Sequence, residues 1–163
     1  MASGGSSIYH AFVKDQLTEQ EARKSSLEQR GLAVITTSGT LASLLLALAA
    51  LVSASDDFEL TSSSRELVVA ASLAFAAAAL AALATNFPLL YASVRADQMS
   101  ALMRDKWGDD QATAEQRVTA TFIGLIATAK RLNRIKAWLL FAAMALEAVA
   151  VLLLAIAVGV ILA

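Results

Sequence analysis

The stretch Leu67–Val94, LVVAASLAFAAAALAALATNFPLLYASV, runs for 28 residues without a charged side chain. Two similar runs are Gly31–Ser53, with 23 residues and no charge, and Ala137–Ala163, whose 27 residues are interrupted only by Glu147. At a rise of about 1.5 Å per residue, each run is long enough as a helix to cross a hydrocarbon layer of about 30 Å. The sequence therefore predicts three transmembrane helices.

The composition agrees with a membrane protein and excludes several kinds of chemistry. Hydrophobic residues make up 58% of the 163 residues and the mean hydropathy is +0.63, whereas soluble domains have about 45–50% apolar residues. The absence of cysteine excludes disulfides, zinc–thiolate sites and thiol nucleophiles, and the single histidine, His10, has no partner for a metal site or a catalytic triad. We therefore expect no enzymatic activity, catalytic residue, metal or cofactor. The net charge of −1 gives no sign of nucleic-acid binding.

A cleaved signal peptide is the alternative explanation for the first apolar run, because the small residues of Val52–Ser55 resemble a cleavage site. The polar segment before this run has 30 residues, and the run itself exceeds the usual apolar region of about 7–15 residues. We expect a retained membrane anchor.

Basic residues predict the orientation of the spans. The bases Arg23, Lys24 and Arg30 lie shortly before the first span, and the loop that follows it is acidic. Positive charge collects on the cytoplasmic side of membrane proteins. We therefore expect a cytoplasmic N-terminus and an outer C-terminus, with the following segments: 1–30 cytoplasmic, 31–53 first span, 54–66 outer loop, 67–94 second span, 95–136 cytoplasmic and 137–163 third span.

The cytoplasmic segments are predicted to be helical, which gives an all-α fold. An N-terminal amphipathic helix carries Tyr9, Phe12, Val13 and Leu17, and capping-box patterns start at Thr18 and Ser25, so one continuous helix and a restart near Ser25 are both consistent with it.

Residues 95–136 are expected to form an antiparallel helical hairpin against which the N-terminal helix docks. Gly108 is the expected helix stop, and Asp110 or Thr113 is the cap of the next helix. The two pairing faces are Met99, Leu102 and Met103 on the first helix, and Val118, Phe122, Leu125, Ala129 and Leu132 on the second.

Small residues at four-residue spacing predict helix packing inside the membrane. They form a ridge in the second span and a shorter one in the first, and such ridges let helices approach closely, although an alanine-rich composition produces them by chance about as readily. At the end of the second span, Asn86-Phe87-Pro88 predicts a kink. The ridges are Ala70, Ala74, Ala78 and Ala82, and Gly39, Ser43 and Ala47.

Glu147 lies about ten residues into the third span, and hence about 15 Å deep, near the bilayer midplane. Thr36, Thr40 and Ser43 share one face of the first span near this depth, and Asn86 lies slightly nearer the cytoplasm, so a polar lining is geometrically possible. An intramembrane carboxyl is either a protonation-linked gate or ion site, or a hydrogen-bonding link between helices or subunits. We favour the link because Glu147 has no charged partner within the apolar runs.

A basic cluster precedes the third span. The favoured interpretation is that it fixes the topology, and the alternative is that it binds an anionic lipid or a phosphorylated signalling ligand. Its members are Lys130, Arg131, Arg134 and Lys136.

Two stretches, Glu21–Thr40 (EARKSSLEQRGLAVITTSGT) and Lys130–Ala137 (KRLNRIKA), resemble uncharacterised small membrane proteins of high-GC actinobacterial type. This resemblance implies a multi-pass protein of the bacterial inner membrane. The layout of helical cytoplasmic segments joined to a few spans is also similar, in architecture only, to the membrane-effector module of Pycsar-type anti-phage systems. We therefore expect a membrane protein of structural or effector type that forms homo-oligomers, with a small proton-linked transporter or channel using Glu147 as the alternative.

Overall fold

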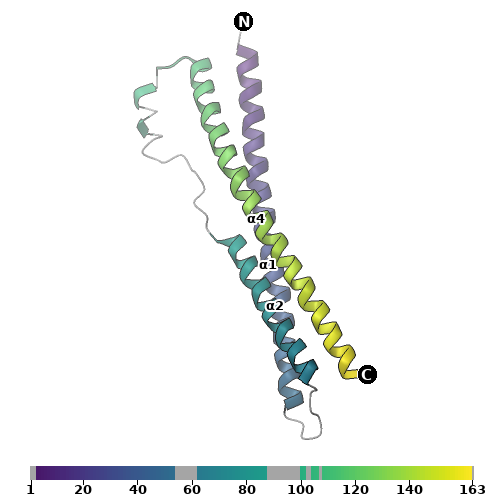
Figure 1. Cartoon of the computed structure of the whole chain (residues 1–163). Helices are drawn as coiled ribbons and strands as arrows, with labels where there is room; N and C mark the ends of the chain where they lie inside the picture. Colours follow the sequence, from purple (N-terminus) through teal and green to yellow (C-terminus); the bar gives the residue numbers. More distant parts are fainter. Residues whose placement is uncertain (1–2, 54–61, 88–99, 102–103, 107, 163) are drawn as a thin grey trace. The chain divides into compact units, whose positions relative to one another are not determined.

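The computed structural model describes residues 3–53, 62–87, 100–101, 104–106 and 108–162. Three long helices dominate them: α1 (Ser3–Ser53), α2 (Ser62–Asn86) and α4 (Gln111–Leu162) (Figure 1). Of the described residues 97% are helical and none lies in a strand, which confirms the all-α prediction.

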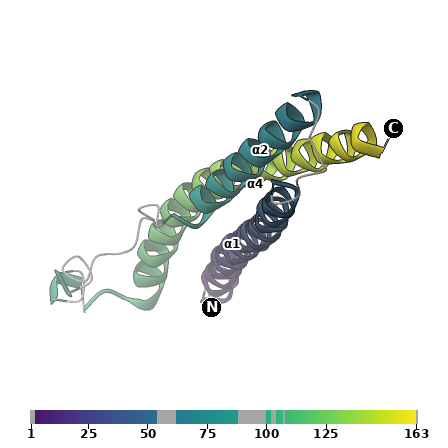
Figure 2. The ribbon, with the colours of Figure 1, turned by 90° about the horizontal axis from the view of Figure 1, so that it is seen from below.

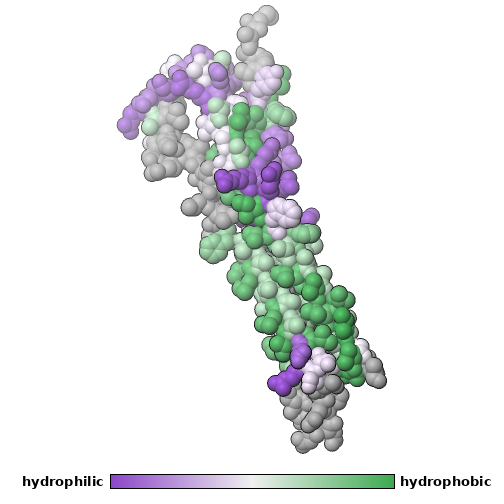
Figure 3. Space-filling model, viewed as in Figure 1, coloured by the Kyte–Doolittle hydropathy of each residue, from purple (hydrophilic) through white to green (hydrophobic). Residues whose placement is uncertain are grey.

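Each of the three helices contains an apolar window long enough to cross a membrane. Large hydrophobic side chains remain exposed along α2 and the C-terminal half of α4, where they cover much of the surface seen in Figure 3. Contiguous apolar surface of this extent is suited to lipid rather than to water. The chain is therefore a multi-pass membrane protein. Its most exposed large apolar residues in these two regions are Leu73, Leu80, Trp138, Phe141 and Leu152.

Two of the helices are much longer than a membrane span. α1 has 51 residues and α4 has 52, so each extends for about 77 Å, against a hydrocarbon thickness of about 30 Å. The predicted helical extensions are thus present. α1 continues without a break through Thr18 and Ser25, and the Thr18 hydroxyl donates to the Lys14 carbonyl at 3.2 Å, as a residue inside a helix does. The restart near Ser25 is not formed.

α2 ends at Asn86, two residues before the only proline. Proline disfavours helical geometry at the preceding residue and supplies no backbone N–H. The Phe87 N–H donates instead to the Ala84 carbonyl at 3.4 Å, closing a tight turn. The second span predicted at 67–94 is described only to Phe87, and its expected pairing face at Met99, Leu102 and Met103 lies outside the described residues.

The chain divides into two compact units. Unit 1 comprises residues 1–26 and 88–135, and unit 2 comprises residues 27–87 and 136–163. Unit 2 contains all of α2 and one half each of α1 and α4, whereas unit 1 contains the other halves of α1 and α4.

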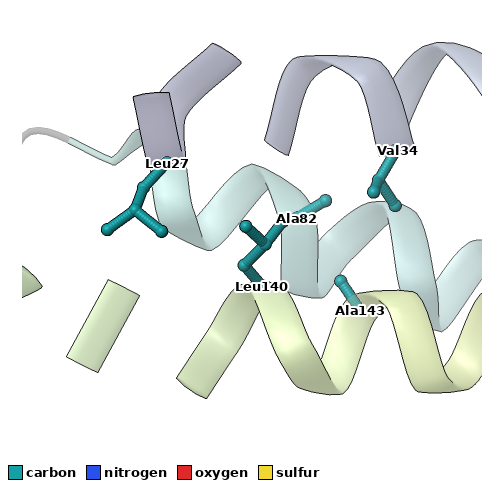
Figure 4. Packing of buried hydrophobic residues seen from close by; sticks show 5 residues of the cluster. All are labelled: Leu27, Val34, Ala82, Leu140 and Ala143. Carbon is teal, nitrogen blue, oxygen red and sulfur yellow. The ribbon is translucent and has the colours of Figure 1, made fainter. Parts of the chain in front are cut away.

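Three helices share the core of unit 2. Leu27 and Val34 of α1 pack with Ala82 of α2 and with Leu140 and Ala143 of α4 (Figure 4). A second cluster joins one residue of each helix: Leu45, Phe75 and Ala150. From the first cluster to the second, the residue numbers rise along α1 and α4 and fall along α2. In unit 2, α1 and α4 therefore run parallel and α2 runs antiparallel to them. In Figure 2, which is seen from below, α2 lies beside the C-terminal part of α4.

The buried residues of all three helices follow alternating three- and four-residue spacing. This spacing is typical of helices that cross at a small angle, as in left-handed coiled coils. We call the row of such positions on each helix its seam. The buried seam residues are Leu27, Gly31, Val34, Ser38 and Leu45 on α1, Ala71, Phe75, Ala78, Ala82 and Thr85 on α2, and Lys136, Leu140, Ala143, Ala150 and Ala157 on α4.

At Gly31, α1 lies close against α2. A β-carbon added there would lie 2.8 Å from Asn86 Nδ2 and 3.3 Å from the Ala82 carbonyl oxygen, and it would overlap the Thr85 hydroxyl. The Thr85 side chain is buried and donates to the Ala82 carbonyl at 2.7 Å, so it cannot easily move aside. Glycine is therefore required at this position by the neighbouring helix.

In unit 1 the N-terminal part of α1 packs against α4, which is the contact expected of the N-terminal helix. His10 packs against the Phe122 ring at 5.6 Å between centroids, and its Nδ1 lies 3.1 Å from the Thr119 hydroxyl. The expected docking residues Val13 and Leu17 are half-buried, but Tyr9 and Phe12 are 71% and 62% exposed. The contact face of α1 is therefore rotated from the expected one.

Of the predicted pairing face on α4, four members are half-buried: Phe122, Leu125, Ala129 and Leu132. The predicted member Val118 is 43% exposed. Asn133, which was not predicted, is buried, and its Nδ2 donates to the Gln20 backbone carbonyl at 2.9 Å.

Asp110 caps the N-terminus of α4. Its Oδ1 accepts from the Thr113 backbone N–H at 2.9 Å and its Oδ2 from the Thr113 hydroxyl at 2.9 Å. Of the two caps that the sequence allowed, the structure has Asp110. The backbone hydrogen bond from Thr113, followed by that from its hydroxyl, holds the pKa of Asp110 below its ordinary value of 3.8, because both donors favour the carboxylate form.

Replacing Gly31 by alanine should destabilise the protein by about 1–3 kcal/mol, the usual effect of overpacking. The free energy of unfolding in mixed detergent–SDS micelles measures this. Gly159→Ala is the matched control, because a β-carbon at Gly159 meets nothing within 4 Å, and it should be neutral or slightly stabilising. Equal stability of the two variants would contradict the close approach of α1 and α2.

Acidification should loosen the first turn of α4. Because the folded-state pKa of Asp110 lies below 3.8, the stabilisation from its cap is complete above that pH and is lost as the pH falls through the folded-state pKa. Amide hydrogen exchange of residues 111–114, corrected for the intrinsic rate, reports the change. Asp110→Asn keeps a cap without a titrating group and should abolish the pH dependence, whereas Asp110→Ala should speed exchange at every pH. An unchanged acid response in Asp110→Asn would assign it to another group.

Candidate intramembrane polar site

Glu147 lies on the seam of α4 in unit 2, four residues after Ala143 and three before Ala150, both fully buried. This spacing directs the carboxyl towards α1. There, Glu147 Oε1 accepts hydrogen bonds from the Thr37 hydroxyl at 2.5 Å and from the Ser38 hydroxyl at 3.2 Å. The half-buried carboxyl therefore joins two helices.

The two hydroxyl donors differ in their surroundings. Ser38 is only 1% exposed, and its hydroxyl donates to Glu147. Thr37 is exposed, and its Oγ1 also lies 3.1 Å from the carbonyl oxygens of Ala33 and of Val34. Because a hydroxyl carries one hydrogen, Thr37 donates either to Glu147 or to its own helix. Ser38 is thus the dedicated partner of the carboxyl and Thr37 an exchangeable one.

The residues predicted to line a polar site with Glu147 lie elsewhere. Thr36, Thr40 and Ser43 are exposed, and each donates to the backbone carbonyl four residues earlier, at 3.0, 2.8 and 2.8 Å. Successive residues of a helix are rotated by about 100°, so a face built on Thr36 points away from one built on Ser38. Asn86 is half-buried and lies 3.4 Å from both the Ala82 carbonyl and the Thr85 hydroxyl.

The predicted packing residues divide between the inside and the outside of unit 2. Ala78 and Ala82 are fully buried, and Ala74 packs against the cluster around Phe75. The remaining ones are exposed: Ala70 on α2, and Gly39 and Ala47 on α1. The short ridge of the first span therefore faces outwards from this chain.

One member of the predicted basic cluster is buried. Lys136 Nζ lies 2.5 Å from Glu28 Oε1, and the lysine side chain is 1% exposed whereas that of Glu28 is 31% exposed. A buried lysine requires such a partner, because an unpaired charge is costly in a medium of low dielectric constant. Lys130, Arg131 and Arg134 are exposed. The cluster thus separates into one structural ion pair and three accessible bases.

Four functional candidates were missed from the sequence: Thr37, Ser38, Gly31 and Glu28. Gly31 and Ser38 fall on the three- and four-residue spacing that also contains Leu27 and Val34, so a polar or glycine residue on that spacing was the available signal. Among the described residues, no three His, Cys, Asp or Glu side chains are grouped to hold a metal ion.

Comparison with protein-family models gave no match, and searches of the curated proteins and of the solved structures gave none either.

The hydrogen bond between Ser38 and Glu147 should appear as a coupling of about 0.6 kcal/mol, and at most about 1.7 kcal/mol, in a double-mutant cycle of Ser38→Ala and Glu147→Leu. Unfolding free energies in mixed micelles provide the four values. The control cycle uses Ser43→Ala, whose hydroxyl bonds its own helix and should show no coupling. Equal coupling in the two cycles would show that Glu147 acts on α1 without a specific partner.

Proposed function

We propose that this chain is a non-enzymatic integral membrane protein of structural or effector type that self-associates in the bacterial inner membrane. The observation that carries the proposal is the exposed face of α1 in unit 2, here called the α1 outer face: Thr36, Gly39, Thr40, Ser43 and Ala47.

The α1 outer face differs from the lipid-type surfaces of the same unit. Its residues are small, whereas α2 and α4 expose side chains such as Leu80 and Phe141, at 67% and 64%. Leu44 and Leu46 are exposed at 61% and 67%, and by helix geometry they lie on either side of the small residues. Small residues bordered by large ones allow a second helix to approach closely, and dispersion contacts then favour association in lipid. A second copy of the chain is the partner that this face fits best.

The hydroxyls of the α1 outer face do not oppose this packing. Those of Thr36, Thr40 and Ser43 are already satisfied by their own helix. They therefore bring no unsatisfied donor into the interface, and their oxygens can still accept a weak bond from a neighbouring helix.

The proposed orientation has a cytoplasmic N-terminus and an outer C-terminus. Two observations support this orientation. In unit 2, α1 and α4 run parallel and α2 runs antiparallel to them, as a chain that crosses the membrane three times requires. Exposed basic residues lie near one end of the apolar part of α4. As an effector, the protein would perturb the membrane in a defence response, in keeping with the architectural resemblance to Pycsar-type modules.

The second candidate is a small proton-linked transporter or channel. Its support is the position of Glu147 in the seam, beside a Thr37 hydroxyl that can change acceptors. Proton flux is measured in proteoliposomes with the wild type and with Glu147→Gln at matched insertion. Flux that the substitution abolishes would favour this candidate, and the absence of flux in both would favour the structural one.

Gly39→Leu should weaken self-association about tenfold or more, because the larger side chain prevents the approach of a second α1. A β-carbon at Gly39 meets nothing within 4 Å in the single chain, so the fold of the monomer should be unaffected. Single-molecule photobleaching in bilayers over a range of protein-to-lipid ratios measures the association constant. Gly159→Leu, equally open in the single chain, is the control. A monomeric wild type, or equal weakening by both variants, would contradict the proposed interface.

A further inference from the structure

Three basic residues lie together on the exposed surface of α4 in unit 1. Lys130, Arg131 and Arg134 are all exposed, and their spacing of one, three and four residues places them within about 100° of the helix circumference. We call them the basic face.

The basic face has no paired counter-charge in the part of the chain that the structure describes. Among the described residues none forms a hydrogen bond or ion pair with these three side chains. The acidic residues of α1 in this unit, Asp15, Glu19 and Glu21, are exposed and do not pair with them.

The sequence of α4 adds to this positive potential. Between Glu115 and Glu147 the helix has five basic residues and no acidic one. Two of the five are paired, Arg117 with Asp109 and Lys136 with Glu28, and the other three form the basic face. A local excess of positive charge therefore remains at the surface and attracts anions.

The basic face immediately precedes the apolar part of the same helix. Four residues after Arg134 comes Trp138, which is 68% exposed and meets Phe141 edge-on, with 5.9 Å between ring centroids. Exposed tryptophan is enriched where a span enters the headgroup region. Along the helix axis Arg134 lies only about 6 Å from this marker, which is within the depth occupied by lipid phosphates.

We propose that the basic face binds the headgroups of anionic phospholipids. Guanidinium groups form paired hydrogen bonds with phosphate oxygens and lysine adds a point charge. Each base near the surface contributes about 1 kcal/mol of attraction, or about a fivefold preference for anionic over neutral lipid. This inference does not depend on self-association or transport, since it concerns the lipid contacts of a single chain.

Quenching of Trp138 by brominated lipids tests the proposal in the full chain. In a Trp107→Phe background Trp138 is the only tryptophan, because the chain has two. The protein is reconstituted in vesicles of phosphatidylcholine that contain either brominated phosphatidylglycerol or brominated phosphatidylcholine at the same fraction. We expect stronger quenching by the brominated phosphatidylglycerol, saturating at a low fraction and weakened by salt.

Replacing Lys130, Arg131 and Arg134 together by glutamine should remove this preference, with a loss of about tenfold or more in relative affinity. The control replaces Lys14, Arg104 and Lys106 by glutamine; all three are exposed, so the same charge is lost elsewhere and the preference should remain. Arg131→Lys with Arg134→Lys keeps the charge and should retain most of the preference. Equal quenching by the two lipids in the wild type, or equal loss in the triple variant and its control, would overturn the proposal.

Discussion

Pairing between α1 and α4 is the constraint on which both units depend. In each unit the helices meet through positions spaced by three and four residues, and the hydrogen bonds between them join residues 108 to 113 positions apart in sequence. Within each unit the residue numbers of these contacts rise together along the two helices, so α1 and α4 run parallel there. In unit 2 this pair, together with α2, sets which side chains point inwards and which are left for lipid or for a partner.

Polar contacts between α1 and α4 specify how the two helices are aligned within each unit. Gln20 meets Asn133, Glu28 meets Lys136, and Ser38 meets Glu147. A polar group between packed helices is costly when it is unpaired, because it has lost its hydration. Sliding one helix by a turn would leave these groups unpaired, so the correct alignment is favoured over its alternatives. A single polar residue in a coiled-coil seam selects register in the same way.

The surfaces that the seams leave outside are chemically distinct. The α1 outer face is small and slightly polar, the exposed sides of α2 and C-terminal α4 are large and apolar, and the basic face is cationic. Each suits a different neighbour: another helix, acyl chains, and lipid phosphates respectively. The proposals of self-association and lipid contact follow from this division of surfaces.

The sequence by itself determined that this protein lies in an apolar medium and how many apolar helices it has, because apolar length is a local property of the chain. It left Asp110 and Thr113 open as the cap of α4, and at Pro88 it predicted a kink where the structure ends α2. Which polar groups meet was decided only by tertiary structure. Thr36 and Ser38 are equally plausible partners of Glu147 in an apolar sequence, and a rotation of α1 exchanges them. Alanine-rich helices have several faces that could pack, and the one that does is set by neighbours: Thr85 and Asn86 opposite Gly31, and Glu28 opposite Lys136.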